Sequence, residues 1–72
     1  PDRRADAPHL QAALQRAIEA LPERRRAVFE LCFLHELTYR EAAQALGVSV
    51  KTVENQMGHA LKAVRAALQE FV

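Results

Sequence analysis

The 72-residue sequence lacks most of what a disulfide-bonded or membrane-spanning protein needs. Its single cysteine, Cys32, excludes an intramolecular disulfide, and its apolar surroundings predict a small buried hydrophobe rather than a reactive thiol. The longest wholly apolar stretch, Leu31 to Leu34, is far shorter than the ~20 residues of a membrane span. No secretory signal is present. We therefore expect a cytoplasmic protein without a membrane partner.

Glycine and aromatic residues are also scarce. There are two glycines, three phenylalanines, one tyrosine and no tryptophan, whereas 50% of the residues are hydrophobic. The core must therefore be aliphatic, and the fourteen alanines and nine leucines favour helix. A chain of this length forms one small domain that buries only about 60% of its unfolded surface.

Positive and negative charges are nearly balanced, and the formal net charge is +1 at pH 7. The distribution is more informative. Between Thr38 and Arg65 four cations face two acids, a net of +2, and the remainder of the chain carries six cations and seven acids, a net of −1. This asymmetry gives weak support to an anionic partner.

Apolar residues recur at spacings of three and four, which predicts an all-α, four-helix domain without strands. Residues 1–7 are expected to form a flexible segment left from a linker, and residues 8–72 the domain. Pro8 and Pro22 can each open a helix. The expected helices cover about residues 8–21, 22–35, 38–46 and 50–70.

The third and fourth expected helices have well-specified ends. Thr38 and Glu41 form a T-x-x-E capping box, Gly47 can adopt a left-handed conformation, and Ser49 can cap the last helix. The expected apolar stripe of that helix is Val50, Val53, Met57, Leu61, Val64 and Leu68, with Ala60 alongside. A short helix, a three-residue turn and a second capped helix are the layout of a helix-turn-helix.

The side of the last helix opposite this stripe is polar. Its expected members are Lys51, Thr52, Glu54, Asn55, Gln56, Gly58, His59 and Lys62. Glu54, Asn55 and Gln56 are side chains that pair with base edges when a recognition helix enters the major groove. A solvated face without function is the alternative, but Gly58 costs about 1 kcal/mol relative to alanine in a helix. The polar face therefore favours DNA binding.

The second expected helix starts with three arginines and ends apolar almost all round. The arginine run is most simply a solvated helix end, with contacts to backbone or a partner as the other reading. Phe29 and Phe33 lie about 100° from the face formed by Val28 and Leu31. This helix is either central, with several neighbours, or it presents the two phenylalanines to a partner protein.

Taken together, these segments resemble region 4 of extracytoplasmic-function sigma factors, from about His9 to Leu68. The segments that carry the resemblance are LPER (21–24), RAVFEL (26–31), LTYREAA (37–43), LGVS (46–49), TVEN (52–55) and ALKAVR (60–65). The resemblance implies a winged-helix-like, four-helix domain that reads the −35 promoter element as part of RNA polymerase holoenzyme. It also implies a nucleoid-associated location, docking on the flap of the polymerase β subunit, and an anti-sigma partner.

Site residues follow from the resemblance position by position. The base contacts it implies are Glu54, Asn55, Gly58 and His59, to which residue type adds Gln56. The phosphate contacts it implies are Arg40, Lys51, Thr52 and Lys62. Phe29 and Phe33 are compatible with docking on the polymerase. Many relatives carry Arg or Lys directly after the Thr-Val pair, where this chain has Glu54, so its base preference and its electrostatic affinity should differ from theirs.

Two other functions compete with this interpretation. One is the effector domain of a LuxR-type transcriptional regulator, and the other is a helical interaction module that binds no DNA. An enzyme is not expected, since His9, His35 and His59 fall on separate elements and no metal-binding spacing or phosphate-binding glycine loop is present. We expect no cofactor and no metal.

Overall fold

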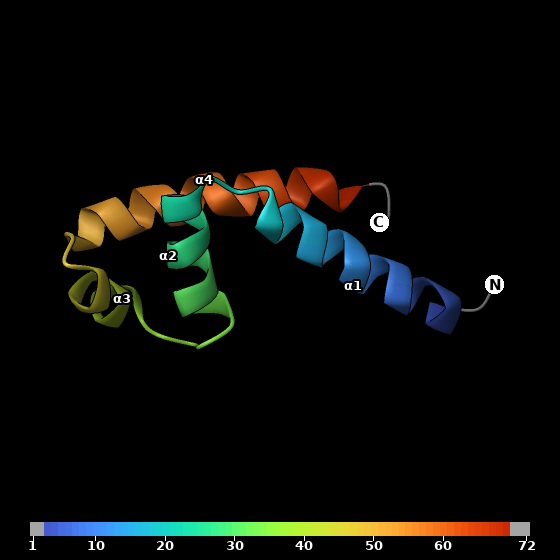
Figure 1. Cartoon of the computed structure of the whole chain (residues 1–72), viewed down its shortest axis with the longest axis horizontal. Coiled ribbons are helices and arrows are strands. Elements are labelled where there is room, and N and C mark those ends of the chain that lie inside the picture. Colours follow the sequence, from blue (N-terminus) through green and yellow to red (C-terminus); the bar gives the residue numbers. More distant parts are fainter. Residues whose placement is uncertain (1–2, 70–72) are drawn as a thin grey trace.

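The computed structural model describes the backbone of residues 3–69 and the side chains of residues 9–69 (Figure 1). Within these residues the chain forms four helices and no strand, which confirms the predicted all-α fold. The helices are α1 (Arg3–Glu19), α2 (Glu23–Phe33), α3 (Tyr39–Leu46) and α4 (Val50–Ala67). None of them is long and apolar enough to cross a membrane.

Helix α4 is the longest element, and the other three helices all pack on it. Figure 1 shows α3 and α2 against its N-terminal half, whereas α1 meets its C-terminal half and then diverges from it. The result is an elongated molecule of 46 × 19 × 17 Å. Because α1, α2 and α3 all pack on α4, one side of α4 is buried along most of its length.

Helix α1 begins at Arg3, earlier than the predicted start near Pro8. Residues 3–7, expected to be flexible, continue the helix instead, and residues 1 and 2 lie outside the described residues. Alanine and arginine favour helix, whereas Pro8, the sixth residue of α1, removes one backbone hydrogen bond and crowds the carbonyl four residues before it. The helix also ends at Glu19, two residues before the predicted end at residue 21.

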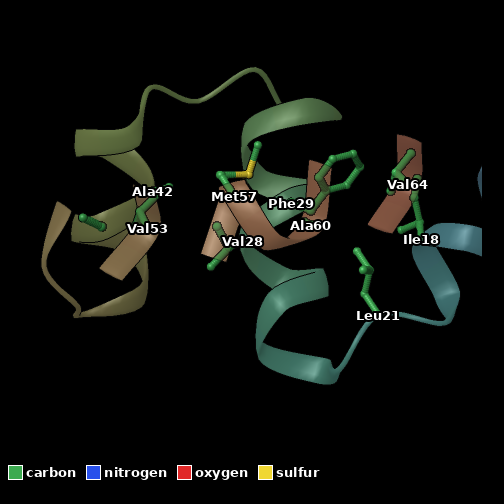
Figure 2. Packing of buried hydrophobic residues seen from close by; sticks show 10 residues of the cluster. Ile18, Leu21, Val28, Phe29, Ala42, Val53, Met57, Ala60 and Val64 are labelled. Atoms are coloured by element: carbon green, nitrogen blue, oxygen red, sulfur yellow. The ribbon is translucent and has the colours of Figure 1, made fainter. Parts of the chain in front are cut away.

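The core is mostly aliphatic, as predicted, but includes the aromatic ring of Phe29, and it is centred on the inner side of α4 (Figure 2). Phe29 and Val53 are the largest fully buried side chains, and Ala60 is fully buried where α4 faces its neighbours. No charged or polar residue is buried among the described side chains. The buried cluster is Ile18, Leu21, Val28, Phe29, Ala42, Ala43, Val53, Met57, Ala60 and Val64.

The buried stripe of α4 is narrower than predicted. Val50 and Leu61 are exposed by 39% and 40%, although both were assigned to the stripe. The buried positions of α4 are 53, 57, 60 and 64. Leu61 lies about 100° around the helix from Ala60. Because Ala60 faces the neighbouring helices, Leu61 is turned towards solvent.

The predicted capping residues are all found in their expected roles. The Thr38 hydroxyl accepts a hydrogen bond from the Glu41 N–H at 3.0 Å, and the Glu41 carboxylate accepts one from the Thr38 N–H at 2.9 Å. Gly47 has φ 70°, in the left-handed region. The Ser49 hydroxyl accepts from the Thr52 N–H at 3.1 Å. These caps determine where α3 begins and ends and where α4 begins.

Cys32 packs against the core but is only half-buried, so it is more accessible than predicted. Burial raises the pKa of its thiol. The thiol is therefore protonated at neutral pH, as expected of a packing residue rather than a nucleophile.

Candidate nucleic-acid interface

Helices α3 and α4 form the predicted helix-turn-helix. The turn between them consists of Gly47, Val48 and Ser49, and the Val48 N–H donates to the Ala43 carbonyl at 3.0 Å. Ala43 and Val53 are buried where the two helices meet. A small residue on α3 and a β-branched residue on α4 let the helices approach closely. The turn therefore holds α4 in a fixed orientation with one side open to solvent.

The open side of α4, here called the outward face, holds most of the predicted contact residues. It consists of Lys51, Glu54, Asn55, Gly58, His59 and Lys62, and all six are exposed. At about 100° per residue, Asn55 and Lys62 lie opposite Val53 on the helix. The structure thus brings together six of the predicted residues on one continuous surface.

The outward face combines base-reading groups with positive charge. Asn55 can donate and accept hydrogen bonds, and Glu54 can accept from a cytosine amino group. Lys51 and Lys62 supply two cations against the one carboxylate of Glu54, a net of +1, and Arg40 is an exposed cation on the neighbouring helix α3. This composition suits contact with both base edges and phosphates.

Gly58 has no role in the packing of the chain. A Cβ atom added there would meet nothing within 4 Å, and its φ lies outside the left-handed region. Alanine would be more favourable at this helical position by about 1 kcal/mol. A glycine at an exposed helical site fits the close approach of a ligand, because it removes the side chain from the surface.

Two predicted contact residues, Gln56 and Thr52, lie on the flank of α4 rather than on its outward face. Gln56 is half-buried, and its Oε1 accepts a hydrogen bond from Arg25 Nε at 3.0 Å. Thr52 is also half-buried, and its hydroxyl lies 3.0 Å from that of Ser49. Gln56 is only about 60° from Val53 around the helix, which turns it towards α2. The sequence had predicted a freely exposed, base-reading side chain at Gln56, and this prediction of free exposure is wrong.

Arg25 was not predicted as a site residue. The arginine run at the start of α2 was interpreted mainly as a solvated helix end, and only Arg24 is fully exposed. Arg26 Nη1 donates to the Glu19 carbonyl at 3.5 Å, and Arg25 contacts Gln56. Sequence alone carries no signal for the second contact, because its partners are 31 residues apart.

The two phenylalanines of α2 have different environments, which corrects the predicted docking role of Phe29. Phe29 is only 1% exposed and belongs to the core, so it cannot contact a partner (Figure 2). Phe33 is 50% exposed, and its ring stacks on that of Phe29 with centroids 5.1 Å apart. Leu34 beside it is 55% exposed. Phe33 and Leu34 are thus the most exposed large apolar side chains among the described residues, and they lie together at the C-terminal end of α2.

No group of three or more metal-ligating side chains is found among the described residues. The three histidines lie on α1, in the loop after α2 and on α4, as their sequence positions indicated. The chemistry that the described surface offers is hydrogen bonding and charge.

Comparison with known proteins places the chain among transcription factors. The family model described as "Sigma-70, region 4" matches residues 11–64. The chain is 41% identical over 54 residues to the ECF RNA polymerase sigma factor RpoE of Cereibacter sphaeroides, covering 75% of this chain and 30% of that protein. It is 39% identical over 61 residues to the RNA polymerase sigma factor FliA of Pseudomonas aeruginosa, covering 85% of this chain and 25% of that protein.

The chain thus spans about a quarter to a third of the length of these two relatives. No solved structure matches it. The match of the family model includes α2, α3, the turn and the whole outward face of α4.

Proposed function

Because the chain belongs to the sigma-70 region 4 family, whose members are non-enzymatic transcription initiation factors, we propose that it binds the −35 element of promoters within RNA polymerase holoenzyme. The reading element is the N-terminal half of α4, inserted into the major groove. Family membership favours this function over a LuxR-type effector domain or an interaction module without DNA. We also propose that the chain belongs to the extracytoplasmic-function group. One of the two relatives named above is called an ECF sigma factor, whereas the name of the other does not include this term.

The observation that supports this proposal most is the division of α4 into two sides. The buried side fixes the helix against α2 and α3 through Val53 and Met57. The opposite side presents Asn55, Glu54 and His59 to solvent. A base-reading residue needs a rigid support and a free functional group, and this arrangement provides both.

Phosphate contacts are proposed at the two ends of the reading segment. The start of α4 carries the positive end of the helix dipole, and Lys51 is exposed beside it. Lys62 and Arg40 are exposed cations on α4 and α3. Thr52 can contribute its hydroxyl from the flank. These groups would position the domain on the duplex, whereas the base contacts would select the sequence.

A second surface is proposed for protein partners. Phe33 and Leu34 form an exposed apolar end on α2, on an element distinct from the reading helix. This surface suits the β flap of the polymerase core or an anti-sigma factor. Such docking would also supply the affinity that a single small DNA-binding module lacks.

The experiment that tests the proposed function is a binding selection from random duplexes. The chain is fused to the flap of the RNA polymerase β subunit, and the flap alone serves as the control. We expect the fusion, but not the flap, to enrich one short motif. Recovery of random sequences only, at a salt concentration high enough to weaken non-specific phosphate contacts, would contradict the proposal.

A further inference from the structure

We propose that Arg25 is a specificity-determining positioning residue that orients the Gln56 amide so that its donor group is the one presented to bases. This inference rests on the proposed function. It concerns a residue of α2 that does not itself belong to the reading helix. It starts from the hydrogen bond of 3.0 Å between Arg25 Nε and Gln56 Oε1.

The chemistry of arginine determines the orientation of the glutamine amide. A free glutamine can present its oxygen or its amino group, because rotation about its terminal bond exchanges the two. Arginine has only donors, so the amide oxygen must face Arg25. The amino group Nε2, which carries two hydrogens, then points away from the guanidinium.

The amide remains accessible although Gln56 is half-buried. Gln56 lines a hollow of about 100 Å³ between the start of α2, the end of α3 and the start of α4. The other lining residues are Arg24, Ala27, Val28, Leu46, Val48 and Thr52. Asn55, the adjacent residue, lies on the outward face. Gln56 itself lies about 100° further around the helix, on the flank that borders the outward face.

A fixed donor selects between bases. A free glutamine pairs with adenine through two bonds, in which its oxygen accepts from N6 and its nitrogen donates to N7. With the oxygen turned towards Arg25, the amide cannot present its oxygen and its nitrogen to one base edge together, and its donors suit the O6 and N7 acceptors of guanine or the O4 acceptor of thymine. The pair thus disfavours adenine at the base position that Gln56 faces.

The first part of the test uses the free protein. In the whole chain labelled with ¹⁵N, the Arg25 Nε–H should exchange slowly with solvent and should lose this protection in Gln56→Ala. Equal exchange rates in the two proteins would overturn the inference without any reference to DNA.

The second part compares base preferences in the random-duplex selection. Arg25→Ala frees the amide, so adenine should gain roughly tenfold relative to guanine or thymine at one position. Arg25→Lys, which keeps a donor-only partner, should retain the original preference. Arg16→Ala is the control, because it removes the same charge from an exposed position on α1, away from the hollow. It should leave the base preference unchanged.

The outcomes separate this inference from the function on which it rests. If wild type selects a motif but Arg25→Ala and Arg16→Ala select the same one, Arg25 has no positioning role and the inference fails alone. If wild type selects no motif although Arg25 Nε–H is protected, the proposed function fails and takes the inference with it.

Discussion

The two sides of α4 belong to the same helix but perform different tasks. The inner side contributes Val53, Met57, Ala60 and Val64 to the core, and each is less than 8% exposed. The outward face contributes no residue to the core and carries polar groups together with an exposed glycine. Stability and recognition are thus assigned to opposite surfaces of one element. Substitutions on the two sides should therefore have separable effects.

The largest effect is expected on the inner side, from Met57→Ala. Met57 is 6% exposed within the core, and truncation of a buried methionine costs about 2–5 kcal/mol. Urea denaturation monitored by circular dichroism measures the loss. Met57→Leu, which conserves volume, should cost less than about 1.5 kcal/mol. Equal stability of Met57→Ala and wild type would show that α4 is not anchored by this side.

Gly47→Val should destabilise the turn that orients the outward face. Gly47 has φ 70°, and a Cβ atom there would meet nothing within 4 Å, so the cost is backbone strain rather than a clash. A β-branched residue in this region costs about 1–3 kcal/mol. Thermal unfolding followed by circular dichroism detects it. An unchanged Tm would mean that the turn does not require the left-handed conformation.

Asn55→Ala should weaken DNA binding and leave the stability of the fold almost unchanged. We expect a loss of about 1–3 kcal/mol in binding to the preferred duplex, restricted to one base position. The free energy of unfolding should change by less than about 0.5 kcal/mol, because the side chain is exposed. Fluorescence anisotropy with duplexes altered at single positions measures the first quantity. An equal loss on every duplex would contradict a base-reading role.

Gly58→Ala should have opposite effects on folding and binding. Alanine should stabilise the helix by about 1 kcal/mol, since the added Cβ has free space. The same methyl group would lie on the outward face and should weaken DNA binding by keeping the helix further from the duplex. Denaturation and anisotropy on the same sample compare the two. Stabilisation without any loss of binding would place the duplex away from Gly58.

Lys51→Ala should have the smallest effect, and it should not depend on base sequence. Removing one phosphate contact should reduce the slope of log K against log salt by roughly one. Binding isotherms at several salt concentrations give the slope. Arg16→Ala, which removes an exposed cation of α1, is the control and should leave the slope unchanged. The same slope in both variants and wild type would contradict the phosphate contact.

The sequence predicted best those features that depend on near neighbours in the chain. The capping box of Thr38 and Glu41, the left-handed Gly47 and the Ser49 cap each need only a few adjacent residues, and all were found. The buried set of α4 was predicted only in part, because an amphipathic pattern does not reveal how wide the contact with the neighbouring helices is. This is why Val50 and Leu61 were misassigned.

The site was predicted less completely than the fold, since contacts between distant segments decide it. The burial of Phe29 and the engagement of Gln56 by Arg25 both depend on how α2 crosses α4. From the sequence alone, Phe29 and Gln56 could each be an exposed side chain with a function. The six residues of the outward face were predicted because their position follows from helical period once the buried side is known.

The most direct test of the division of α4 is a titration of the ¹⁵N-labelled chain with the selected duplex, followed by NMR. The side-chain amide of Asn55 should shift strongly, whereas that of Gln11, an exposed amide on α1, should not move. A strong shift of Gln11 with an unchanged Asn55 signal would show that DNA is bound by another surface, and would contradict the account.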